Sequence, residues 1–131
     1  MSATDTEVRE ALATTLEAVT GLRPHAYVPA SIAPPAAVVT EIDVDFDAAM
    51  GRASDEMTVR VRLLTSGELR AAQLNLSALT YAIRTALWEN PTLGDVVADS
   101  RLQRRIGDSE GQVDVGGATY TVVDLEIQVV T

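Results

Sequence analysis

The 131-residue chain contains no cysteine and no lysine, and it has a single histidine, His25. Without cysteine it can form no disulfide, zinc–thiolate site or iron–sulfur cluster, and it has no cysteine nucleophile. No apolar run approaches the ~20 residues that a membrane-spanning helix needs. Residues 1–5 have neither the basic nor the apolar segment of a secretory signal. We therefore expect a soluble domain that works inside a cell or within a particle.

Catalytic side chains are scarce as well. His25 is the only imidazole, and its position between Pro24 and Tyr27 favours a packing role. The chain contains no Gly-x-Ser-x-Gly elbow, no Gly-x-Gly-x-x-Gly turn and no phosphate-binding loop. These absences predict a protein that is not an enzyme and that binds no cofactor.

Charge of one sign dominates. Nineteen Asp and Glu residues oppose ten basic residues, all of them Arg, so the formal net charge is −9. Because an acidic protein repels a phosphate backbone, tight wrapping of nucleic acid is disfavoured.

The length predicts one domain over residues 1–131. A first helix is expected over about 5–20, since Thr4-x-x-Glu7 forms a capping box before an apolar repeat of three- and four-residue spacing. Gly21 stands where a left-handed cap would end this helix.

An acidic and a basic strand follow. Apolar residues 36–39 have strand length, and residues 41–47 alternate, with Asp43, Asp45 and Asp47 on the outer face. Residues 56–64 alternate again and turn Arg60 and Arg62 outward. If the two strands form a hairpin, the Asp row faces the two arginines across the ladder, and this pairing helps to fix the register.

The same Asp row has a weaker alternative interpretation as a metal site. Asp43-x-Asp45-x-Asp47 resembles the start of a calcium loop, but Ala48 occupies the position that needs Gly and Ser54 that of the bidentate Glu. A solvated or Arg-paired strand face is therefore favoured, and no metal is expected.

Ser66 begins a second helix over about 67–88, whose main apolar stripe recurs at helical spacing. A second stripe consists of Leu74, Tyr81 and Trp88, seven residues apart and rotated by roughly 140° from the first. One helix on a sheet buries only one stripe. The second stripe is therefore either a core layer against the first helix or a contact surface for another subunit.

The C-terminal part predicts strands over 101–106, 112–115 and 118–130, the last two joined by a Gly116-Gly117 hairpin turn. A change of inward phase along the final strand suggests a bulge near Val123-Asp124. Arg101, Arg104 and Arg105 form a basic cluster, which either solvates a strand edge or meets an acidic patch of a neighbouring subunit. Together the elements predict an α+β domain, a mainly antiparallel sheet with two principal helices packed on one face.

Five short groups of residues, spread along most of the chain, match the pattern of a known protein family in their order. They are Gly21-Leu22-Arg23 with Tyr27-Val28-Pro29, Pro34-Pro35-Ala36-Ala37-Val38-Val39, Gly51-Arg52 with Asp55-Glu56, Asn90-Pro91-Thr92-Leu93-Gly94, and Val115-Gly116-Gly117-Ala118-Thr119-Tyr120. In order and spacing they resemble the tail terminator proteins of long-tailed (siphovirus) phages of actinobacteria. His25 departs from the aromatic residue that is common in that family, and the 67–88 helix continues where relatives often have a longer loop.

The resemblance implies a structural virion protein made in the bacterial host cytoplasm. Such proteins form a six-fold ring on the head-proximal end of the tail tube and stop its polymerisation. The ring joins the tube protein to the neck or head-closure protein, and DNA passes through its lumen without sequence readout. Leu74, Tyr81, Trp88 and the three arginines 101, 104 and 105 are then the candidates for the oligomer interface. The alternatives are a head-closure (stopper) or other neck protein and, more distantly, a small acidic metal- or ligand-binding domain that uses Asp43, Asp45 and Asp47.

Overall fold

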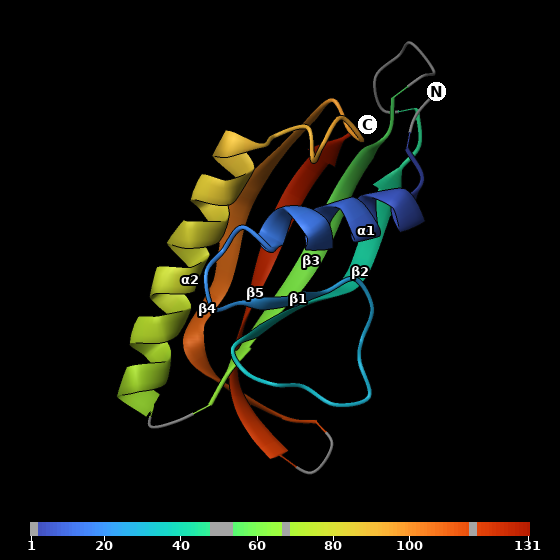
Figure 1. Cartoon of the computed structure of the whole chain (residues 1–131). Coiled ribbons are helices and arrows are strands. Elements are labelled where there is room, and N and C mark those ends of the chain that lie inside the picture. The colour runs from blue at the N-terminus through green and yellow to red at the C-terminus, as the bar shows by residue number, and fades with distance from the viewer. Residues whose placement is uncertain (1–2, 48–53, 67–68, 116–117) are drawn as a thin grey trace.

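Two helices and one five-stranded sheet form the computed structural model of the chain (Figure 1). It describes residues 3–47, 54–66, 69–115 and 118–131, with side chains described outside 107–118. The elements are α1 (Asp5–Leu16), β1 (Arg23–His25), β2 (Ala36–Asp45), β3 (Glu56–Thr65), α2 (Leu69–Glu89), β4 (Asp99–Val115) and β5 (Ala118–Val130). The strand order is β1-β2-β3-β5-β4, and among these described strands only the β1–β2 pairing is parallel. The predicted α+β class with a mainly antiparallel sheet is confirmed.

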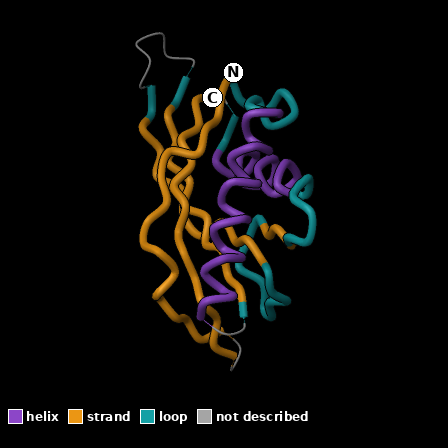
Figure 2. The backbone as a smooth tube through the Cα atoms, turned by 90° about the vertical axis from the view of Figure 1, so that its left-hand side faces the viewer, coloured by secondary structure: helices purple, strands orange, loops and turns teal. Residues whose placement is uncertain are grey.

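Both helices pack on the same face of the sheet, as predicted, and no helix of the described residues lies on the other face (Figure 2). Their apolar stripes enter one core with alternate residues of the strands, because successive side chains of a strand point to opposite faces. The largest fully buried members of this core are Leu12, Leu16, Met57, Leu63, Leu76, Ile83, Leu87, Leu125 and Ile127.

A bulge in β2 decides which of its residues face the helices. Val39 pairs with Val61 and Glu41 with Arg60, so Thr40 is the extra residue, and its hydroxyl donates to the Arg60 carbonyl. Before the bulge, Ala37 and Val39 enter the core; after it, Ile42 and Val44 pack against the core. Glu41, Asp43 and Asp45 consequently point to the helix-free face.

A second, smaller apolar cluster lies on the helix-free face. It consists of Val38, Leu64, Tyr120 and Val122, with Ile32 of the β1–β2 connection packed against it. The Tyr120 hydroxyl donates a 3.0 Å hydrogen bond to the Ile32 carbonyl. At this end the sheet is therefore buried on both faces.

This double burial explains the change of phase along β5. Tyr120 and Val122 face the second cluster, whereas Val123 and Leu125 face the helices. The β3–β5 register runs without a shift from Thr65↔Thr121 to Glu56↔Val130. The predicted bulge in β5 at Val123-Asp124 is therefore wrong, because β5 needs no extra residue when both faces are covered. A register shift does lie at this level between β5 and β4, but its extra residues are in β4, between Ile106 and Gly111.

The helix predictions hold in type but differ in their ends. The capping box of Thr4 and Glu7 is confirmed, yet α1 ends at Leu16, and Gly21 takes its positive φ of 82° in the turn that follows. The second helix is unbroken from Leu69 to Glu89. Residues 48–53, the expected first-turn residues 67 and 68, and the Gly116-Gly117 turn lie outside the described residues.

Candidate interaction surface at the sheet edges

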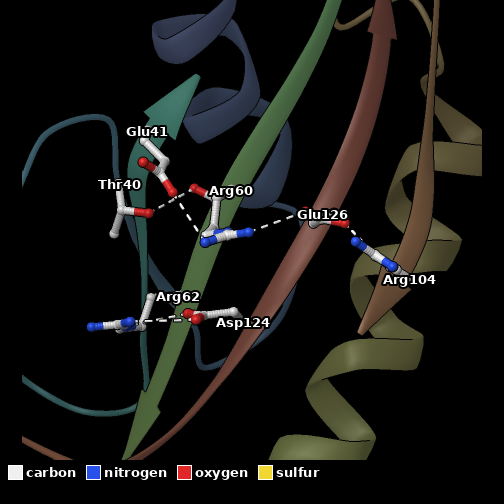
Figure 3. A network of polar contacts seen from close by, with 7 residues as sticks. All are labelled: Thr40, Glu41, Arg60, Arg62, Arg104, Asp124 and Glu126. Atoms are coloured by element: carbon white, nitrogen blue, oxygen red, sulfur yellow. Dashed lines mark hydrogen bonds and ion pairs between the residues drawn. The ribbon is translucent and has the colours of Figure 1, made fainter. Parts of the chain in front are cut away.

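A row of four charged side chains crosses the helix-free face (Figure 3). The guanidinium of Arg60 on β3 lies 3.1 Å from a carboxylate oxygen of Glu41 on β2. It also donates to Glu126 on β5 over 3.2 Å. Arg104 on β4 donates from Nε to the other oxygen of Glu126. Acidic and basic groups thus alternate from β2 to β4.

Glu126 is the centre of this row. Hydrogen bonds from Arg104 first, and from Arg60 second, hold the pKa of Glu126 below its ordinary value of 4.5, against the opposing effect of burial. The same contact raises the pKa of Arg60. The carboxylate is therefore held ionised by two cations, which suits a structural pair better than a proton-transfer group.

The predicted pairing of the Asp row with Arg60 and Arg62 is wrong, although the β2–β3 hairpin itself forms. Asp43 lies opposite Thr58 and Asp45 opposite Glu56. Neither carboxylate makes an ion pair with a described residue. Asp47 follows the strand, and its backbone N–H donates to Asp55. The bulge at Thr40 sets this register.

The arginines instead find their main partners on β5. Arg60 contacts Glu41 and Glu126, and Arg62 contacts Asp124. The sequence signal for this was the matching spacing of Arg60/Arg62 and Asp124/Glu126, two alternating pairs on strands that turn out to be neighbours. Sequence reasoning missed both β5 carboxylates because it took β2 as the only partner.

The structure gives no support to a metal site at the Asp row. Among the described residues, no group of three or more His, Cys, Asp or Glu side chains could hold a metal ion. His25 lies in β1, and its Nε2 is buried without a hydrogen-bond partner in the described part of the chain. None of the described helices is both long and apolar enough to cross a membrane.

The second stripe of α2 is on the surface. Leu74, Tyr81 and Trp88 are 64%, 60% and 61% exposed, so their interpretation as a second core layer is wrong. The reason is that α1 packs against α2 and the sheet through residues on the other side of α2. The guanidinium of Arg84 lies over the Trp88 ring, 4.1 Å from its centre.

Small, exposed residues separate the three large ones. Ala71, Ala78 and Thr85 alternate with Leu74, Tyr81 and Trp88 at spacings of three and four. This is the spacing of a coiled-coil seam. The large side chains therefore project beyond the small residues between them. Another protein surface can pack against such an alternation of large and small side chains.

A groove of about 450 Å³ joins the stripe to the basic cluster. Tyr81 and Arg84 line it from α2, and Arg104 and Arg105 from β4. The structure thus brings one member of the stripe together with two of the three cluster arginines. Arg101, Leu74 and Trp88 do not line the groove; Arg101 lies opposite Gln128 on the helix-free face.

On the helix-free face, the two outer parts of the sheet carry some groups of opposite charge: Glu41 and Asp43 on β2, and Arg104 and Arg101 on β4. β4 is the last strand on the side of α2, and β1 covers only Ala36–Val38 of β2 on the other side. Just beyond the part of β2 that β1 covers, the Val39 carbonyl accepts a hydrogen bond from the Arg9 side chain of α1. The part of β2 that carries Glu41, Asp43 and Asp45 has no strand beyond it in the described sheet (Figure 1).

Comparison with known proteins adds no assignment. No protein-family model matches the chain. A search of curated proteins gives no significant match.

Proposed function

We propose that the chain is a structural ring subunit, the tail terminator of a long-tailed phage. In this role several copies close a ring on the head-proximal end of the tail tube, stop its polymerisation and present a surface to the neck. The resemblance of the sequence segments suggests the family. The observation that carries the proposal is that Glu41 and Asp43 of β2 are level with Arg104 and Arg101 of β4 at the other side of the sheet.

Complementary charges on the two edges of the sheet favour head-to-tail assembly. A ring needs a heterologous contact, in which one surface of a subunit meets a different surface of the next. Glu41 and Asp43 on one edge, level with Arg104 and Arg101 on the other, meet this requirement, whereas Asp45 is level with Asp99 and takes no part in it. Complementary charge also selects the correct partner and orientation.

The outer surface of α2 supplies the apolar contact that such an assembly needs. Aromatic residues are enriched at the centres of protein interfaces. Three large apolar side chains stand exposed along one helix, and the middle one, Tyr81, lines a groove with Arg104 and Arg105 of β4. We assign this stripe to contact with another subunit of the tail.

The remaining features suit a ring through which DNA passes. The net charge of −9 disfavours adhesion of the phosphate backbone to the protein. Six charged groups of the helix-free face are engaged with one another as ion pairs: Glu41, Arg60, Arg62, Arg104, Asp124 and Glu126. A ring that lets DNA pass without sequence readout needs a surface that does not hold the phosphate backbone, and these two features fit that need.

The test is assembly on growing tail tubes. Purified protein is first examined by mass measurement and negative-stain imaging, and then added to polymerising tube protein. A tail terminator forms rings, free or on tube ends, and stops the tubes at a shorter length. Rings that bind the head-side connector but leave tube growth unchanged would favour the head-closure alternative.

A further inference from the structure

The register of the sheet arranges the charges of its helix-free face in level rows. Glu41 lies opposite Arg60, Arg60 opposite Glu126, and Glu126 opposite Arg104. The row therefore crosses β2, β3, β5 and β4 in the order acid, base, acid, base. Each neighbouring pair is in contact.

Both ends of this row are open to a further partner. The side chain of Glu41 is 60% exposed and that of Arg104 is 64% exposed. The contact of Glu41 with Arg60 uses Oε1, and that of Arg104 with Glu126 uses Nε. A carboxylate has two oxygens and a guanidinium five N–H donors, so each end has capacity left.

A second row lies beside the first and ends in the same way. Asp43 is level with Thr58, Thr58 with Gln128, and Gln128 with Arg101. Arg101 and Arg104 share the helix-free face because the register of β4 shifts between Leu102 and Arg104. Two acids thus stand at the β2 edge, level with two arginines at the β4 edge. The next row, from Asp45 to Asp99, ends in acids on both sides, so the complementary contact is confined to the first two rows.

The strand directions also permit continuation. β2 is antiparallel to β3, β3 to β5 and β5 to β4, so β2 and β4 run in opposite directions. A second copy in the same orientation, placed with its β2 beside β4, therefore extends the sheet as another antiparallel pair. Antiparallel edges pair through their free N–H and C=O groups.

We propose that the seam between adjacent subunits joins β4 of one copy to β2 of the next, with Arg104 against Glu41 and Arg101 against Asp43. This proposal rests on the ring of the proposed function and assigns its contact residues. The partner is a second copy of this chain. Pairing of two β4 edges would oppose arginine to arginine, and pairing of two β2 edges would oppose acid to acid.

Charge exchange tests the seam. One variant combines Glu41→Arg with Asp43→Arg, and the other combines Arg101→Glu with Arg104→Glu. Each alone opposes like charges at every seam, so we expect its half-assembly concentration to rise by at least about tenfold over that of the natural chain. A mixture of equal parts restores assembly, because each altered edge then meets a complementary one. A single chain that carries all four changes also assembles by itself.

A matched control separates the seam from bulk charge. Glu10→Arg with Glu17→Arg makes the same change of net charge as Glu41→Arg with Asp43→Arg, but on exposed positions of α1 and the turn after it. We expect this control to assemble at the same concentration as the natural chain. Circular dichroism and thermal melting confirm the fold of each variant. Should a variant not fold, Asp43→Arg and Arg101→Glu serve alone, since neither residue is in an ion pair with a described residue.

Assembly is scored both with free protein and on tube ends. Unchanged assembly of both variants, or two broken variants that the mixture does not restore, overturns the seam while leaving the ring in place. If the natural chain assembles in neither setting, the proposed function fails together with the seam.

Discussion

Arg62 on β3 and Asp124 on β5 form a bidentate ion pair. Arg62 Nε donates to one oxygen of Asp124 over 2.9 Å, and a terminal nitrogen donates to the other over 3.3 Å. The contact raises the pKa of Arg62. Because both side chains are partly exposed, we expect Asp124→Asn to lower the free energy of unfolding by about 1 kcal/mol.

Urea denaturation measures this change. Asp45→Asn is the matched control, since Asp45 is exposed and in no ion pair with a described residue, and its effect is expected within about 0.5 kcal/mol. A double-mutant cycle with Arg62→Met reports the coupling directly. Additive effects in the cycle would show that the two groups do not stabilise each other.

Glu126 gives the fold a pH dependence of known sign. Its pKa in the folded protein is lowered by Arg104 and Arg60, so the ionised form is favoured by folding. This stabilisation is complete above the ordinary value of 4.5 and is lost as the pH falls through the lower, folded pKa. Glu126→Gln should therefore flatten the fall of stability below about pH 4.5.

Melting temperatures of the natural chain and Glu126→Gln, measured from about pH 3, below the ordinary carboxylate pKa values of roughly 4, up to about pH 7, well above them, check this prediction. Glu56→Gln is a suitable control because Glu56 is exposed and in no ion pair with a described residue. Parallel curves for Glu126→Gln and the natural chain would contradict the assignment.

Trp88 and Leu87 are adjacent in α2 but are expected to respond differently to truncation. Leu87 is completely buried, and Leu87→Ala should cost about 2–5 kcal/mol of stability. Trp88→Ala removes an exposed ring and its contact with Arg84, so it should cost less than about 1 kcal/mol. Its main effect should be on assembly.

Urea denaturation and particle-mass measurement on both variants distinguish these outcomes. Leu74→Ala and Tyr81→Ala should behave like Trp88→Ala, with near-natural stability and weakened assembly. If all three assemble like the natural chain, the exposed stripe of α2 is not a contact surface.

Tyr120 tests the smaller apolar cluster on the helix-free face. Tyr120→Phe keeps the ring but removes the hydrogen bond to the Ile32 carbonyl, leaving that acceptor without its partner. We expect a loss of about 0.5–1.5 kcal/mol in urea denaturation. Faster proteolysis between β1 and β2 should accompany it, because this contact holds Ile32 to the sheet. A variant with natural stability and natural proteolysis would show that the contact is not formed in solution.

Local patterns predicted most of the fold. The capping box at Thr4 and the stripe through Leu76 and Ile83 fixed the type of both helices, since each depends on residues close in sequence. The ends of the helices were less predictable: nothing local distinguishes Leu16 from Val19, which is also buried. The alternation in β3 gave its inward face directly.

The charge partners were not predictable in this way. Which acid meets Arg60 depends on the bulge at Thr40 and on β5 being the other neighbour of β3. Both are properties of the assembled sheet. The same holds for Tyr120, whose burial comes from a connection almost ninety residues earlier in the chain, and for Arg104, which a register shift in β4 turns towards Glu126.

The row from Glu41 to Arg104 crosses four strands, and the parity of that number matters. An alternating row of even length begins and ends on opposite signs, so it has a direction, and copies can follow one another indefinitely or around a closed circle. A row of three or five strands would carry like charges at both ends and would reject its own copies. Gain or loss of a single strand in this row would thus replace attraction between the edges of neighbouring copies with repulsion.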